Sequence, residues 1–190
     1  MNHPIRNSHP WVRLQQLIDI GDVKAINSLL NGISPSETAR AVSRLDENRR
    51  RKLLVLLSPM DAADVLQDLP DEQAADLIET MTPRQDARIV AELPNEEQAD
   101  ILADVNKEDA QAILQGLPAD EAQKTRELLQ YSEHAAGGIM TTEYVSYREG
   151  MSVGEVMDDM QAKAQTYSDY HIKYTYVTSD QGHLRGVLRM

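Results

Sequence analysis

The stretch SPMDAADVLQDLPDEQAADLIETMTPRQDARIVAELPNEEQADILADV, residues 58–105, repeats a pattern of apolar, capping and acidic residues with a period of twelve. The period continues on both sides, and each unit opens on an apolar residue: Ile33, Leu45, Leu57, Leu69, Met81, Leu93, Val105 and Leu117. The next position holds a residue that starts a helix or turns the chain. In Ser58-Pro59 and Thr82-Pro83, an N-cap residue precedes a proline at the first helical position. The pattern therefore predicts that each unit begins a new helix.

Two further positions of each unit complete one apolar side of such a helix. Four units share an alanine at one position: Ala63, Ala75, Ala87 and Ala99. The next apolar residues of the unit are a pair that begins two positions after the alanine: Val65-Leu66, Leu77-Ile78, Ile89-Val90, Ile101-Leu102 and, in a unit without the alanine, Ile113-Leu114. Together with the opening residue they form a buried stripe on a helix of roughly ten residues. Ser/Thr-Pro openings alternate with Leu-Pro or Leu-Asp openings, so the larger repeat is a helical hairpin of two units.

Such hairpins bury their apolar faces by stacking on one another. We therefore expect an α-helical solenoid, or superhelix, over residues 12–130, preceded by a flexible N-terminus over residues 1–11. The first helix pair of this domain is expected to turn at Gly21-Asp22.

The sequence changes character after residue 130. Gly137-Gly138 are predicted to break the preceding helix by supplying positive φ angles. Beyond them, EYVSY (residues 143–147) is typical of a strand, and residues 172–190 are typical of two strands joined by a turn at residues 179–182. Between these, Ser152 with Glu155 three residues later matches a capping box and predicts the start of a helix with one apolar face: Val153, Val156, Met157 and Met160. We expect a linker over residues 131–141 and an α/β unit over residues 142–190.

Composition excludes several classes of protein. The 190 residues include no cysteine, which rules out disulfides, thiolate zinc sites and cysteine nucleophiles. A net charge of −12 argues against a nucleic-acid partner, whose phosphates require a basic surface. No apolar run approaches the roughly 20 residues that span a bilayer. Phosphate-binding loops, nucleophile elbows and HExxH sequences are also absent, so we expect a protein that is not an enzyme.

Negative charge is concentrated in the repeat. Residues 60–121 hold 17 acidic residues against three basic ones, a difference of −14, so cations or basic surfaces are the expected partners. Glu96 and Asp100 are four residues apart and share a helix face, and Asp64 and Asp76 occupy the same unit position as Asp100. Clusters of oxygen ligands suit hard cations such as magnesium or calcium. A solvated acidic surface that binds no ion is the alternative.

Two features together resemble a known family. Met140-Thr141-Thr142, EGMSVGEVM and the hairpin YVTSDQGHLRGVL look like the start of a CBS domain. The acidic helical repeat, joined to AGGIMT at residues 136–141, resembles the cytosolic region of MgtE-type magnesium transporters, and the resemblance runs from about Val12 to the end. It implies a mainly α fold: an α-helical solenoid of the MgtE N-domain type followed by a partial CBS unit, with the chain ending inside the first CBS domain.

The resemblance also implies a function. In the family, magnesium ions bind between the helical and CBS domains and favour a compact state in which the pore is shut. The implied role is that of a soluble, magnesium-sensing region at the cytoplasmic face of the inner (plasma) membrane, with Mg²⁺ as a low-affinity regulatory ion. The implied partners are divalent cations, the remaining CBS and transmembrane domains of the same protein, and a second copy in a full-length homodimer.

The metal ligands that the resemblance implies are Asp64 in AADVL, Glu96 and Asp100 in LPNEEQADIL, and the carbonyl of Gly138. This sequence departs from the family just before Ala136. Glu133 is kept, but His134 and Ala135 stand where the family usually has further acidic residues. The opposing acids of a second CBS domain are also absent, so the sequence predicts part of a metal site.

Two other functions remain open on the sequence alone. A protein-binding helical solenoid, related in architecture to flagellar motor-switch proteins, would use its acids merely for solubility. A fragment of a CBS-regulated enzyme would be followed by a catalytic domain. The residues that follow Met190 in the gene product would discriminate among the three functions.

Overall fold

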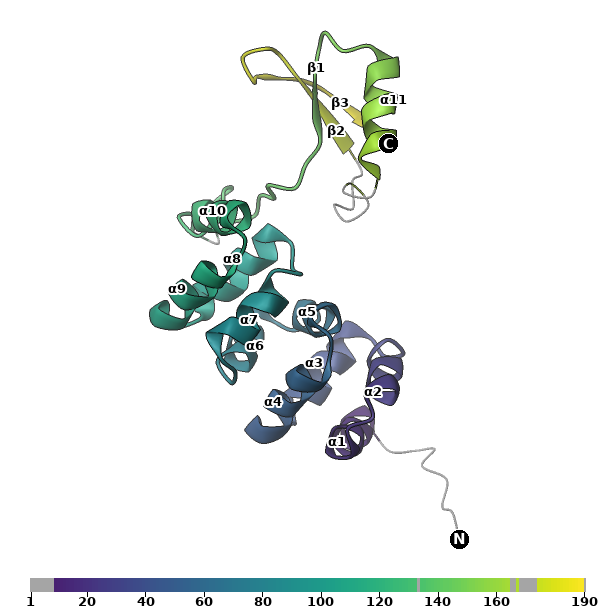
Figure 1. Cartoon of the computed structure of the whole chain (residues 1–190), viewed down its shortest axis with the longest axis vertical. Coiled ribbons are helices and arrows are strands. Elements are labelled where there is room, and N and C mark those ends of the chain that lie inside the picture. Colours follow the sequence, from purple (N-terminus) through teal and green to yellow (C-terminus); the bar gives the residue numbers. More distant parts are fainter. Residues whose placement is uncertain (1–8, 133, 165–166, 168–173, 190) are drawn as a thin grey trace. The chain divides into compact units, whose positions relative to one another are not determined.

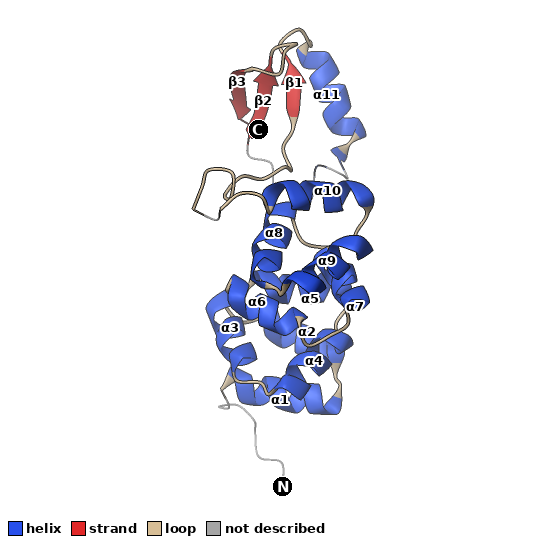
Figure 2. Cartoon of the chain, turned by 90° about the vertical axis from the view of Figure 1, so that its left-hand side faces the viewer, coloured by secondary structure: helices blue, strands red, loops and turns tan. Residues whose placement is uncertain are grey.

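A computed structural model of the chain describes residues 9–132, 134–164, 167 and 174–189. The chain divides into two compact units, Met1–Met140 and Thr141–Met190. Helices make up the described part of the first unit, whereas the second combines a small sheet with one helix (Figures 1 and 2). The predicted flexible N-terminus lies mostly outside the described residues, and the first helix begins at Pro10.

The helices of the first unit follow the twelve-residue period. They are α1 (Pro10–Ile20), α2 (Val23–Leu30), α3 (Pro35–Ser43), α4 (Glu47–Leu56), α5 (Pro59–Gln67), α6 (Asp71–Ile78), α7 (Pro83–Val90), α8 (Asn95–Asp104), α9 (Lys107–Gly116) and α10 (Ala119–Leu128). From α3 to α10, each helix begins twelve residues after the previous one. The prediction that each unit restarts a helix is confirmed.

Local hydrogen bonds explain why the helices begin where they do. The side chains of Asp46, Ser58 and Asn106 each accept a hydrogen bond from the backbone N–H three residues later. Ser34 and Thr82 form capping boxes, and a proline at the first helical position follows each of them. These contacts satisfy amide groups that an α-helix leaves without intrahelical partners at its N-terminus.

Packing between helices two apart in the sequence builds the solenoid. In one row α5 contacts α7 and α7 contacts α9, and in a second row α6 contacts α8 and α8 contacts α10. The predicted alanines and apolar pairs are all buried, and so are most of the residues that open the units. Because the contacts join alternate helices, the structural repeat is a stacked hairpin of two units, as the alternating openings predict.

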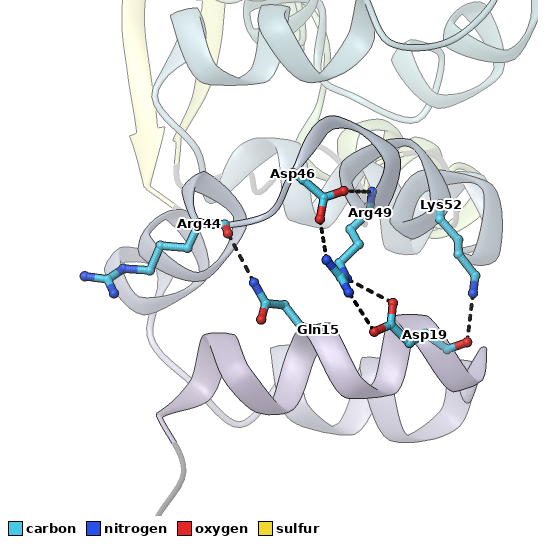
Figure 3. Close-up of polar contacts among 6 residues, drawn as sticks. All are labelled: Gln15, Asp19, Arg44, Asp46, Arg49 and Lys52. Carbon is cyan, nitrogen blue, oxygen red and sulfur yellow. Dashed lines mark hydrogen bonds and ion pairs between the residues drawn. The ribbon is translucent and has the colours of Figure 1, made fainter.

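A polar network ties α1 to the start of α4 (Figure 3). The Arg49 guanidinium donates to both carboxylate oxygens of Asp19 at 2.9 Å and also contacts Asp46. Lys52 donates to the backbone carbonyl of Asp19 at 2.9 Å. The hydrogen bond from Arg49 lowers the pKa of Asp19.

Gly21 ends α1 in the left-handed conformation with φ of 79°, which confirms the predicted turn.

The second unit contains the strands β1 (Ser146–Arg148), β2 (Tyr174–Thr178) and β3 (Leu184–Arg189) and the helix α11 (Val153–Ala162). In the sheet, β2 lies between β1, which is parallel to it, and β3, which is antiparallel. The predicted turn forms, with the N–H of Gly182 donating to the carbonyl of Ser179 at 2.9 Å. The predicted hairpin also included residues 172, 173 and 190, which lie outside the described residues.

The second unit departs from the predictions in two details. The predicted strand at residues 143–147 starts late, since β1 begins at Ser146, where pairing with Tyr176 starts. The capping box of Ser152 and Glu155 forms, but the apolar face of α11 stays open in the described part of the chain, with Val153 80% and Met157 61% exposed. Asp159 attaches α11 to the sheet by accepting a hydrogen bond from the Tyr147 hydroxyl at 3.0 Å.

Candidate functional site

Three of the four predicted ligands line one pocket of the first unit, which we call the α8–linker pocket. Glu96 and Asp100 project from α8, and Gly138 approaches from the segment that follows α10. Apolar residues complete the wall: Ala99, Ala103, Leu128, Leu129, Tyr131 and Met140. The volume is about 40 Å³, which suits an ion or a few waters and is too small for an organic cofactor.

The linker folds back on itself to bring Gly138 to this pocket. The Gly138 N–H donates to the Ala135 carbonyl at 2.9 Å, and the Ala135 N–H donates to the Ser132 carbonyl at 2.8 Å. Gly137 lies against the Tyr131 ring so closely that an added Cβ would come within 2.3 Å of Tyr131 Cδ1. A side chain at position 137 would therefore force the Tyr131 ring or the linker backbone to shift.

This packing corrects the predicted role of Gly137-Gly138. Among the described residues, the glycines with positive φ are Gly21 and Gly182, and neither linker glycine is one of them. The helix has already ended at Leu128, several residues earlier. The expectation that these glycines end the helix through positive φ is thus wrong, because a sequence pattern cannot show the tertiary contact with Tyr131.

Carboxylates accumulate around α8. The Oε2 atom of Glu96 is buried and has no hydrogen-bond partner among the described residues. Burial raises the pKa of Glu97, and the negative charges of Asp71, Asp100 and Glu96 raise it further. A bound cation would lower this pKa, because it favours the charged carboxylate.

Asp64 lines a different pocket, between α2 and α5. Its neighbours there include Asp61 of the same helix, Asp68 at the C-cap of that helix and Asn27 of α2. Burial raises the pKa of Asp64, with further contributions from Asp61 and Asp68. Asp61 is held in place by the Asn27 amide, which donates to its Oδ2 at 2.9 Å. The structure therefore brings Glu96, Asp100 and Gly138 together and places Asp64 in a separate acidic pocket.

The donors of the α8–linker pocket fit part of a magnesium site. Two carboxylates suit an ion that keeps several of its waters, and the unpartnered Glu96 oxygen is the kind of ligand that such an ion accepts. Within the part of the chain that the structure describes, no group of three or more His, Asp or Glu side chains is arranged to hold a metal ion. The two carboxylates could therefore supply only part of the ligand set that such an ion needs, and the remaining ligands would be waters or residues of another domain.

Sequence reasoning missed Glu97 and the surroundings of Asp64. The two-unit repeat could have pointed to Glu97, because α6 packs on α8. This packing brings Asp71, at the start of α6, close to Glu97, near the start of α8. The contribution of α2 to the pocket around Asp64 had no signal in the sequence, because the first helix pair lies outside the regular repeat.

Comparison with known proteins identifies relatives of this fold. The family model described as the MgtE intracellular N domain matches residues 33–134. The magnesium transporter MgtE of Thermus thermophilus is 44% identical over 63 residues, 33% of this chain and 14% of that protein. The magnesium transporter MgtE of Enterococcus faecalis is 36% identical over 72 residues, 38% of this chain and 16% of that protein. The alignments thus span less than a fifth of either transporter.

Two solved structures are similar over nearly the whole chain. A crystal structure of the soluble part of a magnesium transporter has a TM-score of 0.76 and 28% identity, covering 95% of this chain and 70% of that chain. A crystal structure of the cytosolic domain of the Mg²⁺ channel MgtE in complex with ATP has a TM-score of 0.78 and 34% identity, covering 95% of this chain and 73% of that chain. No helix in the described ranges is both long and apolar enough to cross a bilayer.

Proposed function

Because the chain belongs to the family of the MgtE intracellular N domain, we propose that it is the magnesium-sensing regulatory part of a magnesium transporter. Its proposed place is the cytoplasmic face of the membrane that holds the pore, and its role there is regulatory rather than enzymatic. The proposed partners are divalent cations, the remaining domains of the same protein and a second copy in a homodimer. The single observation that carries the proposal is the convergence of Glu96, Asp100 and Gly138 on one ion-sized pocket.

The proposed mechanism is electrostatic. Residues 60–121 carry a charge difference of −14, so an acidic surface brought close to them is repelled. A divalent ion shared between two such surfaces supplies positive charge that removes the repulsion. Its differential affinity for the state in which the surfaces meet shifts the population toward that state. Glu96 and Asp100 hold the ion from the α8 side, and Asp64 supplies a second, separate point of attachment.

Magnesium affinity should be low in this chain alone. Magnesium loses its waters reluctantly, and only part of a ligand set is present. At a magnesium concentration about equal to Kd, the free energy of unfolding rises by RT ln 2, about 0.4 kcal/mol. A weak site is also what a sensor of an abundant ion requires.

The experiment compares thermal unfolding of the parent with that of the triple variant Asp64→Ala, Glu96→Ala, Asp100→Ala. Millimolar magnesium chloride is compared with sodium chloride at matched ionic strength, because screening of surface charge alone also stabilises an acidic protein. We expect the triple variant to lose the magnesium-specific increase in melting temperature and to keep the general salt response. In amide NMR spectra of the parent, magnesium should shift the resonances of α8 and of Gly138.

A matched control removes the same number of charges elsewhere. Asp76, Glu92 and Asp104 are exposed and line neither acidic pocket, so their triple alanine variant should keep the magnesium-specific response. If both triple variants respond to magnesium as the parent does, the carboxylates of the two pockets are ordinary solvated groups and the proposed sensing mechanism fails.

A further inference from the structure

Two arginines on α7 stand apart from the acidic segment around them. Arg84 and Arg88 are two of the three basic residues between positions 60 and 121, and both are exposed. They are four residues apart on one face of α7, where like charges repel. Neither forms an ion pair with any residue that the structure describes. In a segment with 17 acidic residues, these two neighbouring arginines thus face solvent.

A hollow lies on each side of this pair. The first, of about 150 Å³, lies between α7 and the junction of α4 with α5, and its wall is largely aliphatic, including Leu54, Val55, Met81 and Ile89. A cavity of this volume accommodates a benzene-sized apolar group. Arg88 and Gln85 stand at its edge. Val55 is 57% exposed, so part of this apolar wall faces water.

The second hollow lies between α7 and α9 and exists because the residues there are small. An added Cβ on Gly116 would come within 2.6 Å of the Ala87 Cβ, so the two helices approach closely at that point. Ala87, Ala112 and Gly116 line the hollow, and Arg84 and Arg88 also line it. We call the two hollows and the arginines between them the arginine groove.

The described lining of the arginine groove lacks the negative charge that dominates the rest of residues 60–121. No aspartate or glutamate of the described part of the chain lines either hollow. Its arginines lie four apart beside an aliphatic wall, so the groove offers cationic and apolar contacts side by side. Screening limits the influence of distant acids, since the Debye length is about 8 Å at physiological ionic strength.

We propose that the arginine groove binds an acidic segment of a partner protein, with carboxylates on Arg84 and Arg88 and an aliphatic side chain in the hollow beside Val55. The guanidinium group matches a carboxylate through two parallel hydrogen bonds. A concave groove between helices fits a peptide better than it fits the broad surface of a membrane. A short segment is a more suitable occupant than a second copy, because it carries fewer negative charges than a chain of net charge −12 and meets less repulsion from the acids around the groove.

This surface is independent of the proposed metal site. Glu96, Asp100 and Gly138 line the α8–linker pocket, and Asp64 lines the pocket beside α2, whereas the groove lies along α4, α5, α7 and α9. Binding at the groove can therefore be tested without magnesium.

The test begins with selection of random twelve-residue peptides, displayed on phage, against the immobilised full chain. Enriched peptides are then made with a fluorescein label and titrated by fluorescence anisotropy. We expect enrichment of Asp and Glu next to Leu, Ile or Met, and an affinity that falls with added sodium chloride. The double variant Arg84→Glu, Arg88→Glu should weaken binding by about tenfold or more. Val55→Glu should weaken binding as well, because it places a carboxylate at the apolar hollow.

The double variant Arg13→Glu, Arg40→Glu is the matched control, because both arginines are exposed, on α1 and α3, and neither lines a hollow of the groove. It should bind the selected peptides as the parent does, and circular dichroism should show that every variant keeps its helices. Selection without acidic enrichment, or equal binding by the double variant, would overturn the proposal. So would arginine-dependent self-association in sedimentation velocity, or arginine-dependent capture by phosphatidylserine vesicles without peptide binding, since these identify a second copy or a lipid surface as the occupant.

Discussion

The substitution Asp86→Asn should stabilise the protein, and by more at high pH than at low pH. Asp86 lies on α7, is 2% exposed, and has a buried Oδ1 atom with no hydrogen-bond partner among the described residues. It occupies the unit position that holds buried alanines in other helices: Ala62, Ala74, Ala110 and Ala122. Burial raises its pKa to about 7, and the charge of Asp109 contributes in the same direction.

The sign and size of the effect follow from proton linkage. The carboxyl group has a pKa of about 7 when folded and an ordinary value of 3.8 when unfolded, so between these values the folded state binds more protons. The free energy of unfolding therefore falls as pH rises through this window. One pKa unit corresponds to about 1.4 kcal/mol, so the loss reaches about 4 kcal/mol at most by pH 8. Asparagine keeps the shape of the protonated acid and does not ionise.

Urea denaturation followed by far-ultraviolet circular dichroism, at several pH values from about 4 to 8.5, measures the difference between variant and parent. We expect a difference near zero at pH 4 that grows to about 2–4 kcal/mol above pH 7.5. Asp76→Asn is the control, because Asp76 is exposed on α6, and its difference from the parent should not grow in this way. A flat difference for Asp86→Asn would refute the argument, since it would mean that folding leaves the pKa of Asp86 unchanged.

Two further predictions concern contacts that hold the first unit together. Gly137→Ala should lower the free energy of unfolding by about 1–3 kcal/mol, because the added Cβ meets the Tyr131 ring. In a double-mutant cycle measured by thermal unfolding, Tyr131→Ala should relieve most of this loss, and additive effects of the two changes would contradict the contact. Thr125→Val should lower the free energy of unfolding in urea by about 1–3 kcal/mol, because it removes the hydroxyl that donates to the buried Gln98 Oε1 at 2.7 Å. Thr125→Ser keeps that donor and should lose less. A larger loss for the serine variant would point to packing instead of the hydrogen bond.

The candidate site could be predicted in part. The spacing of Glu96 and Asp100 placed both on one face of α8, because that relation lies within a single helix. Their meeting with Gly138 depended on family resemblance, since nothing in the intervening residues specifies that the linker turns back. In the structure, the turned-back linker packs Gly137 against the Tyr131 ring. Asp64 was grouped with the other ligands, but it lies in its own pocket, where the pairing of α2 with α5 decides its neighbours.

The sequence by itself determined where each helix of the repeat begins and which side of it is apolar, because caps, prolines and helical spacing act within one turn or two. Tertiary structure alone decided which helices lie side by side, and with them the burial of Asp86, the rise in the pKa of Glu97 and the exposure of the arginine groove. These properties depend on the distance between groups on different helices. Local propensities leave that distance undetermined, and the close packing of the rows sets it.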